Sequence, residues 1–314
     1  MSAEPTSTPS LIDEDARSYG VDDETGALNL ITPERVLSAI GSVRQGRIYD
    51  LDAGRFMGMP LWSGHPQLTV LGYRSPYGLA VTGEMAQFHP GPNSARQSFN
   101  SDMVISSTHT GCHIDALSHI TIGDDAHWYN GYRAADSLSD HGPMRADAAA
   151  LSPIVARGVL ADVAAYRSVD RLPAHDGVGV EELQAVLRNQ GTMPRRGDVL
   201  LLRTGLMRDW PNAARMAEGD GSGLRLDAAH WLADTVGVAA VGADNSDVEA
   251  LPSDDPNAPQ PVHVFLLIKR GVPLIEFAYL EELARDRVYE FLFVALPLKI
   301  SGTTGSMIRP IAVV

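Results

Sequence analysis

Apolar residues occur in two patterns along the chain, short continuous runs and helical spacing. Segments of the two patterns alternate from one end of the sequence to the other. Short apolar runs predict strands at residues 46–51, 101–108, 154–163, 197–204, 238–244, 272–276, 289–298 and 309–314. Apolar residues at helical spacing predict helices at 32–41, 181–191, 226–237 and 261–271, each ending at a glycine. This alternation indicates an α/β protein. No predicted strand leads into a Gly-x-Gly-x-x-Gly turn, which argues against a doubly wound nucleotide-binding fold.

Nothing in the sequence divides the chain into halves. No repeat or flexible linker interrupts the alternation, so residues 20–314 are expected to form a single domain. Residues 1–19 are predicted to be a disordered or extended tail, because they lack the basic start and the apolar core of a signal peptide.

Residues 55–100 are rich in Gly, Pro, Ser and aromatic residues and show little periodicity, which predicts a system of surface loops. Four ring-bearing side chains in or near this segment either form the wall of a substrate pocket or pack the loops on themselves. They are Phe56, Trp62, His65 and Phe88.

The charge and cysteine content narrow the class of protein. The formal net charge is −14, which argues against nucleic acid and anionic membrane as partners, since both require a basic surface. The single cysteine excludes an intrachain disulfide, and no apolar run reaches transmembrane length. A cytoplasmic protein that acts on a small molecule is therefore expected.

The candidate chemistry is concentrated in the segment His-Thr-Gly-Cys-His-Ile-Asp-Ala-Leu-Ser-His. It holds His109, His113, Asp115 and His119, although the whole chain has only ten histidines. Imidazole and carboxylate groups are the ligands that Zn²⁺, Mn²⁺ and non-haem iron use in proteins. The segment therefore predicts a metal site.

Strand geometry supports part of this site. On a strand, His113 and Asp115 point to the same face, roughly 6.6 Å apart along the chain. His109 would lie roughly 13 Å from His113 on a straight strand. The chain should therefore bend at Gly111, where the backbone is free to do so. If a helix begins after Asp115, His119 stands one turn further on, where it serves as a general base and not as a ligand.

Cys112 offers a competing interpretation as a catalytic thiol. It lies between two predicted ligands, but on an extended backbone its side chain points away from the face that carries His113. The metal interpretation therefore takes precedence.

The spacing His-x-Gly-x-His-x-Asp, followed by a histidine four residues later, resembles the signature of the cyclase family of metal-dependent hydrolases. This family includes bacterial kynurenine formamidases, isatin hydrolase and trans-dienelactone hydrolases. The segments Gly-Ala-Leu-Asn-Leu-Ile-Thr-Pro-Glu-Arg near the start and Phe-Leu-Phe-Val-Ala-Leu-Pro-Leu-Lys near the end are similar too. The resemblance, which is to the longer members, spans about residues 20–314. One departure is Cys112, where the family usually has Thr.

The resemblance implies a swivelling β/β/α fold with a mostly β core or barrel and peripheral helices, assembled as a homodimer or homotetramer. It also implies that His263 and Glu276 complete the metal site around Asp115, with Zn²⁺ or Mn²⁺ as the ion. One ion or two, and the identity of the substrate, stay open.

Three functions fit these residues. The first is a hydrolase in which a metal-bound water opens an amide, formamide or lactone carbonyl of a small, often cyclic molecule, with His119 moving the proton. The second is a lyase or cyclase in which the ion stabilises an enolate. The third, a non-catalytic metal-binding protein, is the weakest, because every residue of the motif is present.

Overall fold

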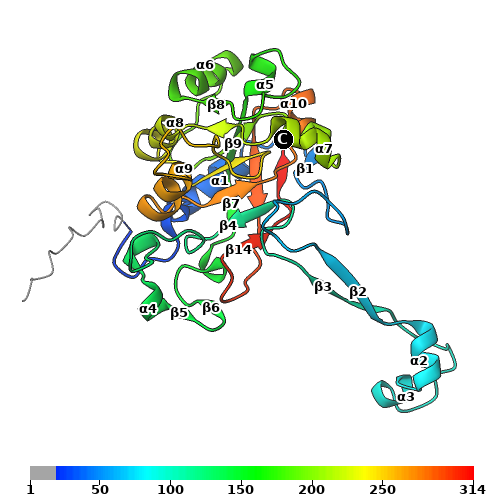
Figure 1. The fold of residues 1–314 in the computed structure, drawn as a ribbon. Coiled ribbons are helices and arrows are strands. Elements are labelled where there is room, and N and C mark those ends of the chain that lie inside the picture. The colour runs from blue at the N-terminus through cyan, green and yellow to red at the C-terminus, as the bar shows by residue number, and fades with distance from the viewer. Residues whose placement is uncertain (1–18) are drawn as a thin grey trace, which may run out of the picture.

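The computed structural model describes residues 19–314, and its centre is a curled sheet of nine strands (Figure 1). The strand order is β1-β15-β13-β7-β9-β11-β12-β4-β14. The strands β7, β9, β11 and β12 run parallel, and the other neighbours pair antiparallel. The bounds are β1 Ile48–Asp50, β4 His113–Asp115, β7 Ile154–Asp162, β9 Val199–Arg203, β11 Ala240–Ala243, β12 Leu274–Glu276, β13 Glu290–Ala295, β14 Gly305–Met307 and β15 Ile311–Val313.

All four predicted helices are present. The first is α1, Pro33–Ile40, and it begins where the hydroxyl of Thr32 accepts a hydrogen bond from the backbone N–H of Arg35. The second is α6, Val180–Gln190, which ends at Gly191 with a φ of 70°. The other two begin as α-helix and continue as π-helix: α8 Leu226–His230 with η7 Trp231–Val236, and α9 Pro261–His263 with η8 Val264–Lys269.

The remaining elements are short. The helices are α4 Ala134–Ser137, α5 Val163–Tyr166, α7 Ala213–Met216 and α10 Glu281–Arg285, with 3₁₀ turns η2 Gly26–Leu30, η3 Tyr129–Gly131, η4 Ala148–Ala150, η5 Leu206–Asp209 and η6 Ala217–Gly219. The strands pair as β5 Leu138–Ser139 with β6 Gly142–Pro143, and as β8 Gly177–Val178 with β10 Gly223–Leu224.

Both faces of the sheet are buried along its parallel strands. On β9, Leu200 and Leu202 pack against the helices α6 and α8, whereas Val199 and Leu201 pack with β7 and β13 into a second cluster. This explains why the sequence of β9 is apolar at successive positions. The fold is thus the predicted α/β architecture, a curled sheet with peripheral helices. None of the helices in residues 19–314 is long and apolar enough to cross a membrane. The predicted tail lies outside the described residues, apart from residue 19.

The prediction of surface loops at residues 55–100 missed three regular elements in the middle of that segment. Strand β2, Thr69–Arg74, pairs with β3, Ser101–Ile105, and the two helices α2, Pro76–Thr82, and α3, Met85–Phe88, lie between them. The ribbon and its helical tip project from the body of the molecule (Figure 1), and we call residues 69–105 the arm. Helix α2 forms because Ser75 caps it and Gly83 ends it with a φ of 70°.

Candidate metal centre

The metal-ligand motif begins with a sharp bend directly after the arm. Gly111 has a φ of 63°, in the left-handed region, which reverses the direction of the chain between His109 and His113. Arg55 holds this bend, because its Nε donates a hydrogen bond to the carbonyl oxygen of Thr110 at 2.8 Å and its guanidinium also bonds to the carbonyl of Cys112. The predicted bend at Gly111 is therefore confirmed, and the role of Arg55 was not foreseen.

Strand β4 lies between β12 and β14, and this pairing brings distant residues together. His113 is the direct cross-strand partner of Glu276 on β12. On the other side, Asp115 is paired with Gly305 of β14, where a Cβ atom would lie 2.5 Å from Cε1 of His109. A glycine is therefore required at residue 305 for the His109 ring to occupy its position.

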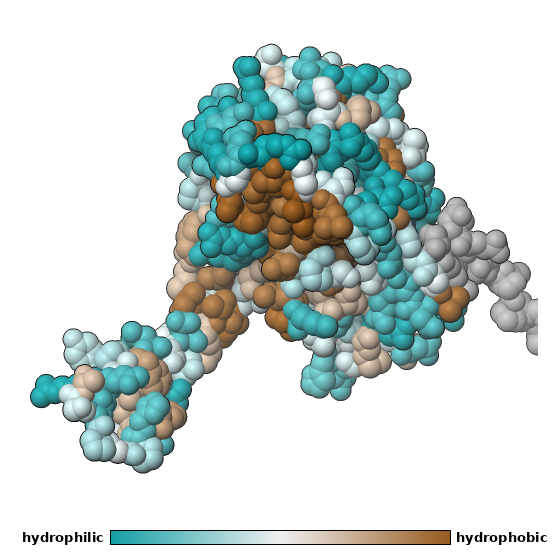
Figure 2. All heavy atoms as spheres, turned by 180° about the vertical axis from the view of Figure 1, so that it is seen from behind, coloured by the Kyte–Doolittle hydropathy of each residue, from teal (hydrophilic) through white to brown (hydrophobic). Residues whose placement is uncertain are grey.

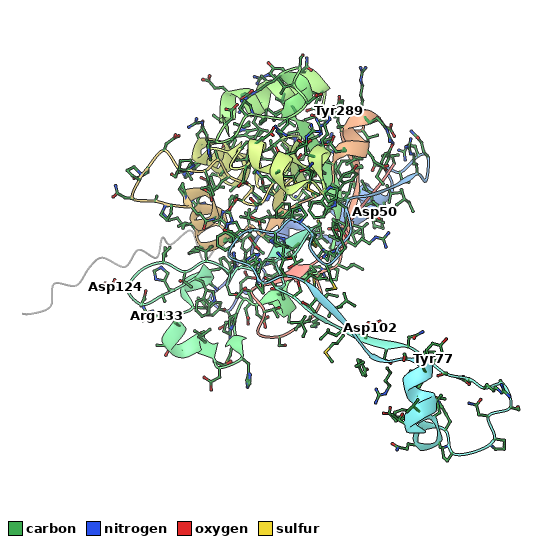
Figure 3. All side chains as sticks on the ribbon, turned by 45° about the vertical axis from the view of Figure 1, so that its right-hand side comes forward. Asp50, Tyr77, Asp102, Asp124, Arg133 and Tyr289 are labelled. Atoms are coloured by element: carbon green, nitrogen blue, oxygen red, sulfur yellow. The ribbon has the colours of Figure 1, made fainter. Side chains whose placement is uncertain are left out.

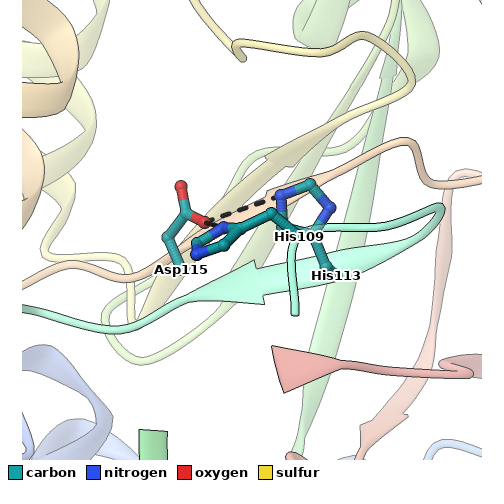
Figure 4. Close-up of side chains that lie close together, drawn as sticks. All are labelled: His109, His113 and Asp115. Atoms are coloured by element: carbon teal, nitrogen blue, oxygen red, sulfur yellow. Dashed lines mark hydrogen bonds and ion pairs between the residues drawn. The ribbon is translucent and has the colours of Figure 1, made fainter. Parts of the chain in front are cut away.

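The first group of potential ligands is His109, His113 and Asp115 (Figure 4). Nδ1 of His109 lies 2.7 Å from Oδ1 of Asp115, and Nε2 of His113 lies 3.6 Å from the same oxygen. All three residues are buried. Ligand atoms around one tetrahedral zinc ion lie roughly 3.4 Å apart, so this spacing suits a shared ion.

The second group is Asp115, His263 and Glu276, and it shares Asp115 with the first. Nε2 of His263 lies 4.0 Å from Oδ2 of Asp115 and 3.3 Å from Oε1 of Glu276. Oε2 of Glu276 lies 3.2 Å from Nε2 of His113, which joins the two groups. The structure thus brings together all five residues that were predicted as ligands.

Two of the carboxylate oxygens in this cluster are buried without a hydrogen bond. They are Oδ2 of Asp115 and Oε1 of Glu276. A buried carboxylate oxygen that accepts no hydrogen bond is costly, and a cation that coordinates it removes the cost. The residues present therefore fit a divalent metal ion.

The tautomers of two histidines also suit metal binding. Nδ1 of His113 donates to the carbonyl oxygen of Gly111 at 2.8 Å, and Nδ1 of His263 donates to the carboxylate of Glu249. Each Nδ1 therefore carries the proton, and each Nε2 offers its lone pair toward the cluster. Hydrogen bonds of this type to the second ring nitrogen are the rule for metal-ligating histidines.

Glu249 is a functional candidate that the sequence did not reveal. Its carboxylate also accepts hydrogen bonds from the backbone N–H groups of Val262 and His263, at 3.1 and 3.0 Å, so that it caps α9 and orients the imidazole. Residue 249 lies in an acidic stretch without motif spacing, and only the fold places it beneath His263.

Burial and neighbouring carboxylates act in opposite directions on the pKa values of His263 and His113. Burial disfavours the charged form of His263, but its interactions with the carboxylates of Glu249 and Glu276 outweigh burial and raise the pKa of His263 well above its usual value. The pKa of His113 is raised as well, because its interactions with Glu276 outweigh burial. Without an ion, the imidazoles of His113 and His263 are thus pulled toward the protonated form, because the neighbouring carboxylates favour positive charge there.

His119 stands beside this cluster, but not on a helix. After Asp115 the chain makes a turn in which the N–H of His119 donates to the carbonyl oxygen of Ala116 at 3.0 Å. The ring of His119 stacks on that of His109 with a centroid distance of 4.2 Å. Burial lowers the pKa of His119, which favours the neutral imidazole that a general base requires.

A cavity of about 240 Å³ opens onto the cluster. Four of the five ligand candidates line it, all except Asp115, together with Trp62, His65, His119, Asp247 and Phe277. A neighbouring cavity of about 270 Å³ shares Trp62 and Phe277 with it, and a larger one of about 750 Å³ shares His119.

The four ring-bearing residues of the 55–100 segment lie in different environments. Trp62 and His65 line the pocket, as one of the two interpretations expected. Phe56 instead packs edge-on against Trp210, at a centroid distance of 5.9 Å. Phe88 packs against Phe99 in the arm, at 5.8 Å, and does not reach the pocket.

Phe277 owes its place in the pocket to an unusual backbone conformation. Its φ is 52°, which is rare for a bulky residue, and its N–H donates to the carbonyl oxygen of Asn245 at 2.9 Å. The backbone therefore turns sharply at Phe277, directly after β12 ends at Glu276. Strain of this kind clusters at binding and catalytic sites.

Cys112 is 1% exposed and belongs to the core cluster that also contains Ile114. Burial raises the pKa of its thiol well above the usual value, so the reactive thiolate is disfavoured. The structure agrees with the expectation that this side chain points away from His113, and the thiol interpretation loses its support.

Comparisons with known proteins identify a family for this chain and solved structures with a similar fold. A sequence profile described as "Putative cyclase" matches residues 49–250. A solved structure described as a novel cyclase is 28% identical, with a TM-score of 0.83 and coverage of 96% of this chain and 99% of that one. Isatin hydrolase A from Ralstonia solanacearum is 21% identical, with a TM-score of 0.63 and coverage of 90% and 97%. Isatin hydrolase A from Labrenzia aggregata is 18% identical, with a TM-score of 0.60 and coverage of 90% and 98%. No curated protein matches the chain.

Proposed function

The chain belongs to the cyclase family, and we propose that it is a metal-dependent hydrolase that opens an amide, formamide or lactone carbonyl of a small, often cyclic molecule. The observation that carries the proposal is the pair of buried ligand groups that share Asp115. Their unbonded carboxylate oxygens, on Asp115 and Glu276, lie where an ion would satisfy them.

The ion would be Zn²⁺ or Mn²⁺, both of which accept imidazole and carboxylate ligands. Five residues would hold it: His109, His113, Asp115, His263 and Glu276. Such an ion supplies a Lewis acid that lowers the pKa of water and polarises a carbonyl group. Glu249 and the carbonyl of Gly111 keep His263 and His113 in the tautomers that binding requires.

His119 is the residue that we assign to proton transfer. It is partly exposed to the pocket, it stacks on a ligand, and its ring belongs to neither ligand group. A neutral imidazole in this position accepts a proton from the attacking water and returns it to the leaving group. Trp62 and Phe277, on the pocket wall, give a planar ring two aromatic surfaces to lie against.

Elemental analysis and kinetics on two ligand variants and a matched control test this proposal. His113→Ala and Asp115→Ala should lose most of the bound metal and the activity toward a panel of small amides, formamides and lactones. His141→Ala is the control, because His141 is exposed and lies in neither ligand group. Full metal occupancy in the first two variants would contradict the metal site.

Isotope labelling separates hydrolysis from the lyase or cyclase alternative. Hydrolysis in H₂¹⁸O places one labelled oxygen in the product acid, whereas elimination or cyclisation through an enolate places none. A product without label would overturn the hydrolase assignment and leave the metal site standing.

A further inference from the structure

A cavity of about 750 Å³ adjoins the pocket of the metal centre. The two share three residues, His119, Ile120 and Gln260, so a molecule bound in one can extend into the other. The metal pocket alone measures about 240 Å³, which is less than the roughly 300–1,000 Å³ of a site that encloses a drug-sized ligand. Together the two cavities have room for a substrate that is much longer than its reacting group.

The wall of the larger cavity is largely apolar. Its apolar side chains include Ile120, Ile122, Leu226, Val264 and Phe265. Apolar side chains also occur on open surface, for example along the arm and in one area of the body (Figure 2). The cavity differs from those areas, because it removes a ligand from water on several sides. It therefore suits a hydrocarbon or aromatic part of a small molecule.

The charge of this cavity is opposite to that of the whole chain. Lys269 and Arg270 line it, and none of its lining residues within the described part of the chain is acidic. The sequence as a whole has 39 acidic and 25 basic residues. Asp124, which follows one wall of the cavity in the sequence, lies at the outer edge of the body near Arg133 (Figure 3). The cavity therefore favours an anionic group, which the acidic surface elsewhere repels.

Of the two basic side chains, Lys269 is the one available to a ligand. Nε of Arg270 lies 2.5 Å from Oδ1 of Asp234, and the guanidinium stacks over the ring of Phe265 at 4.9 Å. Lys269 is exposed, and its ammonium group pairs with no carboxylate of residues 19–314. Its three N–H donors can therefore bind the oxygens of a carboxylate in the cavity.

One continuous helix connects Lys269 to the metal centre. The ligand candidate His263 is the last residue of α9, and Lys269 is the last residue of the π-helix η8 that continues it. A helical rise of about 1.5 Å per residue separates the two by about 9 Å along the axis. Val264 and Phe265, which lie between them in the sequence, both line the cavity. Turns of π-helix are rare and occur frequently at functional sites.

We propose that the larger cavity is the second half of the substrate site, where its apolar wall binds the middle of the substrate and Lys269 binds a carboxylate at the far end. The inference rests on the proposed hydrolase function, which places the reacting carbonyl at the metal centre. The substrate is then an amide, formamide or lactone with a carboxylate roughly 9 Å from the reacting carbonyl. Contacts remote from the reacting group supply binding energy that holds this group in place.

Binding of matched hydroxamic acids to the metal-loaded protein tests the cavity without requiring turnover. Hydroxamates chelate divalent metal ions, so benzohydroxamic acid reports on the metal centre alone. An analogue with a propanoic acid group in the para position adds a carboxylate that extends toward Lys269, and its primary amide is the uncharged counterpart. Isothermal titration calorimetry gives the Kd of each compound for the wild type, Lys269→Met and the control Lys299→Met. Lys299 is the only other lysine of the chain, is exposed, and lines neither cavity.

The carboxylate analogue should bind the wild type and Lys299→Met about fivefold more tightly than the amide does, because one partly exposed ion pair contributes up to about that factor. Lys269→Met should abolish this difference, and Lys269→Glu should reverse it. Equal binding of the two analogues to the wild type would overturn the proposal, and so would a difference that survives in Lys269→Met. If benzohydroxamic acid itself does not bind, the result contradicts the metal centre of the proposed function, and this inference is overturned with it.

Discussion

His113 on β4 and Glu276 on β12 face each other directly across an antiparallel pair, with Nε2 and Oε2 3.2 Å apart. This single register joins the local His-x-Asp motif to a residue more than 160 positions further along the chain. A shift of one residue in that pairing would turn Glu276 to the opposite face of the sheet and dismantle the second ligand group.

Glu276→Gln should therefore weaken metal binding strongly. The change keeps the size of the side chain but removes the negative charge that balances the cation. Glu182→Gln is the matched control, because Glu182 pairs with Arg167 at the surface. Metal affinity is measured by competition with a chromogenic chelator, and equal affinity in the two variants would remove Glu276 from the site.

His119→Ala should separate chemistry from binding. Because His119 lies outside both ligand groups, the variant should keep its metal and its melting temperature. General acid–base catalysis is typically worth 10²–10⁴-fold, so kcat should fall by about that factor while KM changes little. If the variant contains no metal, His119 is a ligand. If the variant is fully active, His119 is a packing residue.

Glu249→Gln should act through His263. Loss of a hydrogen-bond partner of this kind typically costs 10–100-fold in metal affinity. A purely structural role would lower the melting temperature of the metal-free protein and leave the affinity of the folded protein unchanged. Comparing the metal affinity with the melting temperature of the metal-free protein therefore distinguishes a positioning role from a structural one. Glu249→Asp should restore the melting temperature more fully than it restores the metal affinity.

Asp247 should make the unfolding free energy of the metal-free protein depend on pH. Burial, with a contribution from the charge of Glu276, raises the pKa of Asp247 from 3.8 to about 6. Between these values the native state binds more protons than the unfolded state, so the stability that this group contributes is full below pH 3.8 and lost as the pH rises through 6.

Asp247→Asn removes this dependence. Relative to the wild type, the variant should gain up to about 3 kcal/mol in unfolding free energy between pH 3 and pH 7. Urea unfolding in the presence of a chelator measures the difference at each pH. A difference that does not change with pH would show that the Asp247 carboxyl titrates normally.

Local signals in the sequence were sufficient for much of the fold. Thr32 with Pro33 marked the start of α1, and Gly191 marked the end of α6, because caps depend on a few adjacent residues. Ser75, Pro76 and Gly83 are signals of the same kind around α2, but they were overlooked in a segment whose composition favoured loops.

The site could be predicted from the sequence only in part. His109, His113 and Asp115 lie close together in the chain, so a strand and a bend brought them into one place. His263 and Glu276 came from the family resemblance, since no spacing rule connects them to residue 115. Glu249 and Arg55 depend wholly on tertiary contacts.

The helix expected after Asp115 was wrong for a local reason. Ile120, Thr121 and Ile122 are β-branched, and such residues disfavour a helix. Ile122 instead forms an isolated antiparallel bridge with His127. His119 still reaches the cluster, but through a turn.

The burial of Cys112 makes the molecule convenient for spectroscopy. Its one native thiol is 1% exposed and deep in the core, so thiol-reactive reagents encounter no native competitor on the folded surface. A cysteine introduced at Tyr77 would take up a single fluorophore or spin label at the tip of the arm. Such a label would report on the surroundings of the arm tip without first deleting the native cysteine.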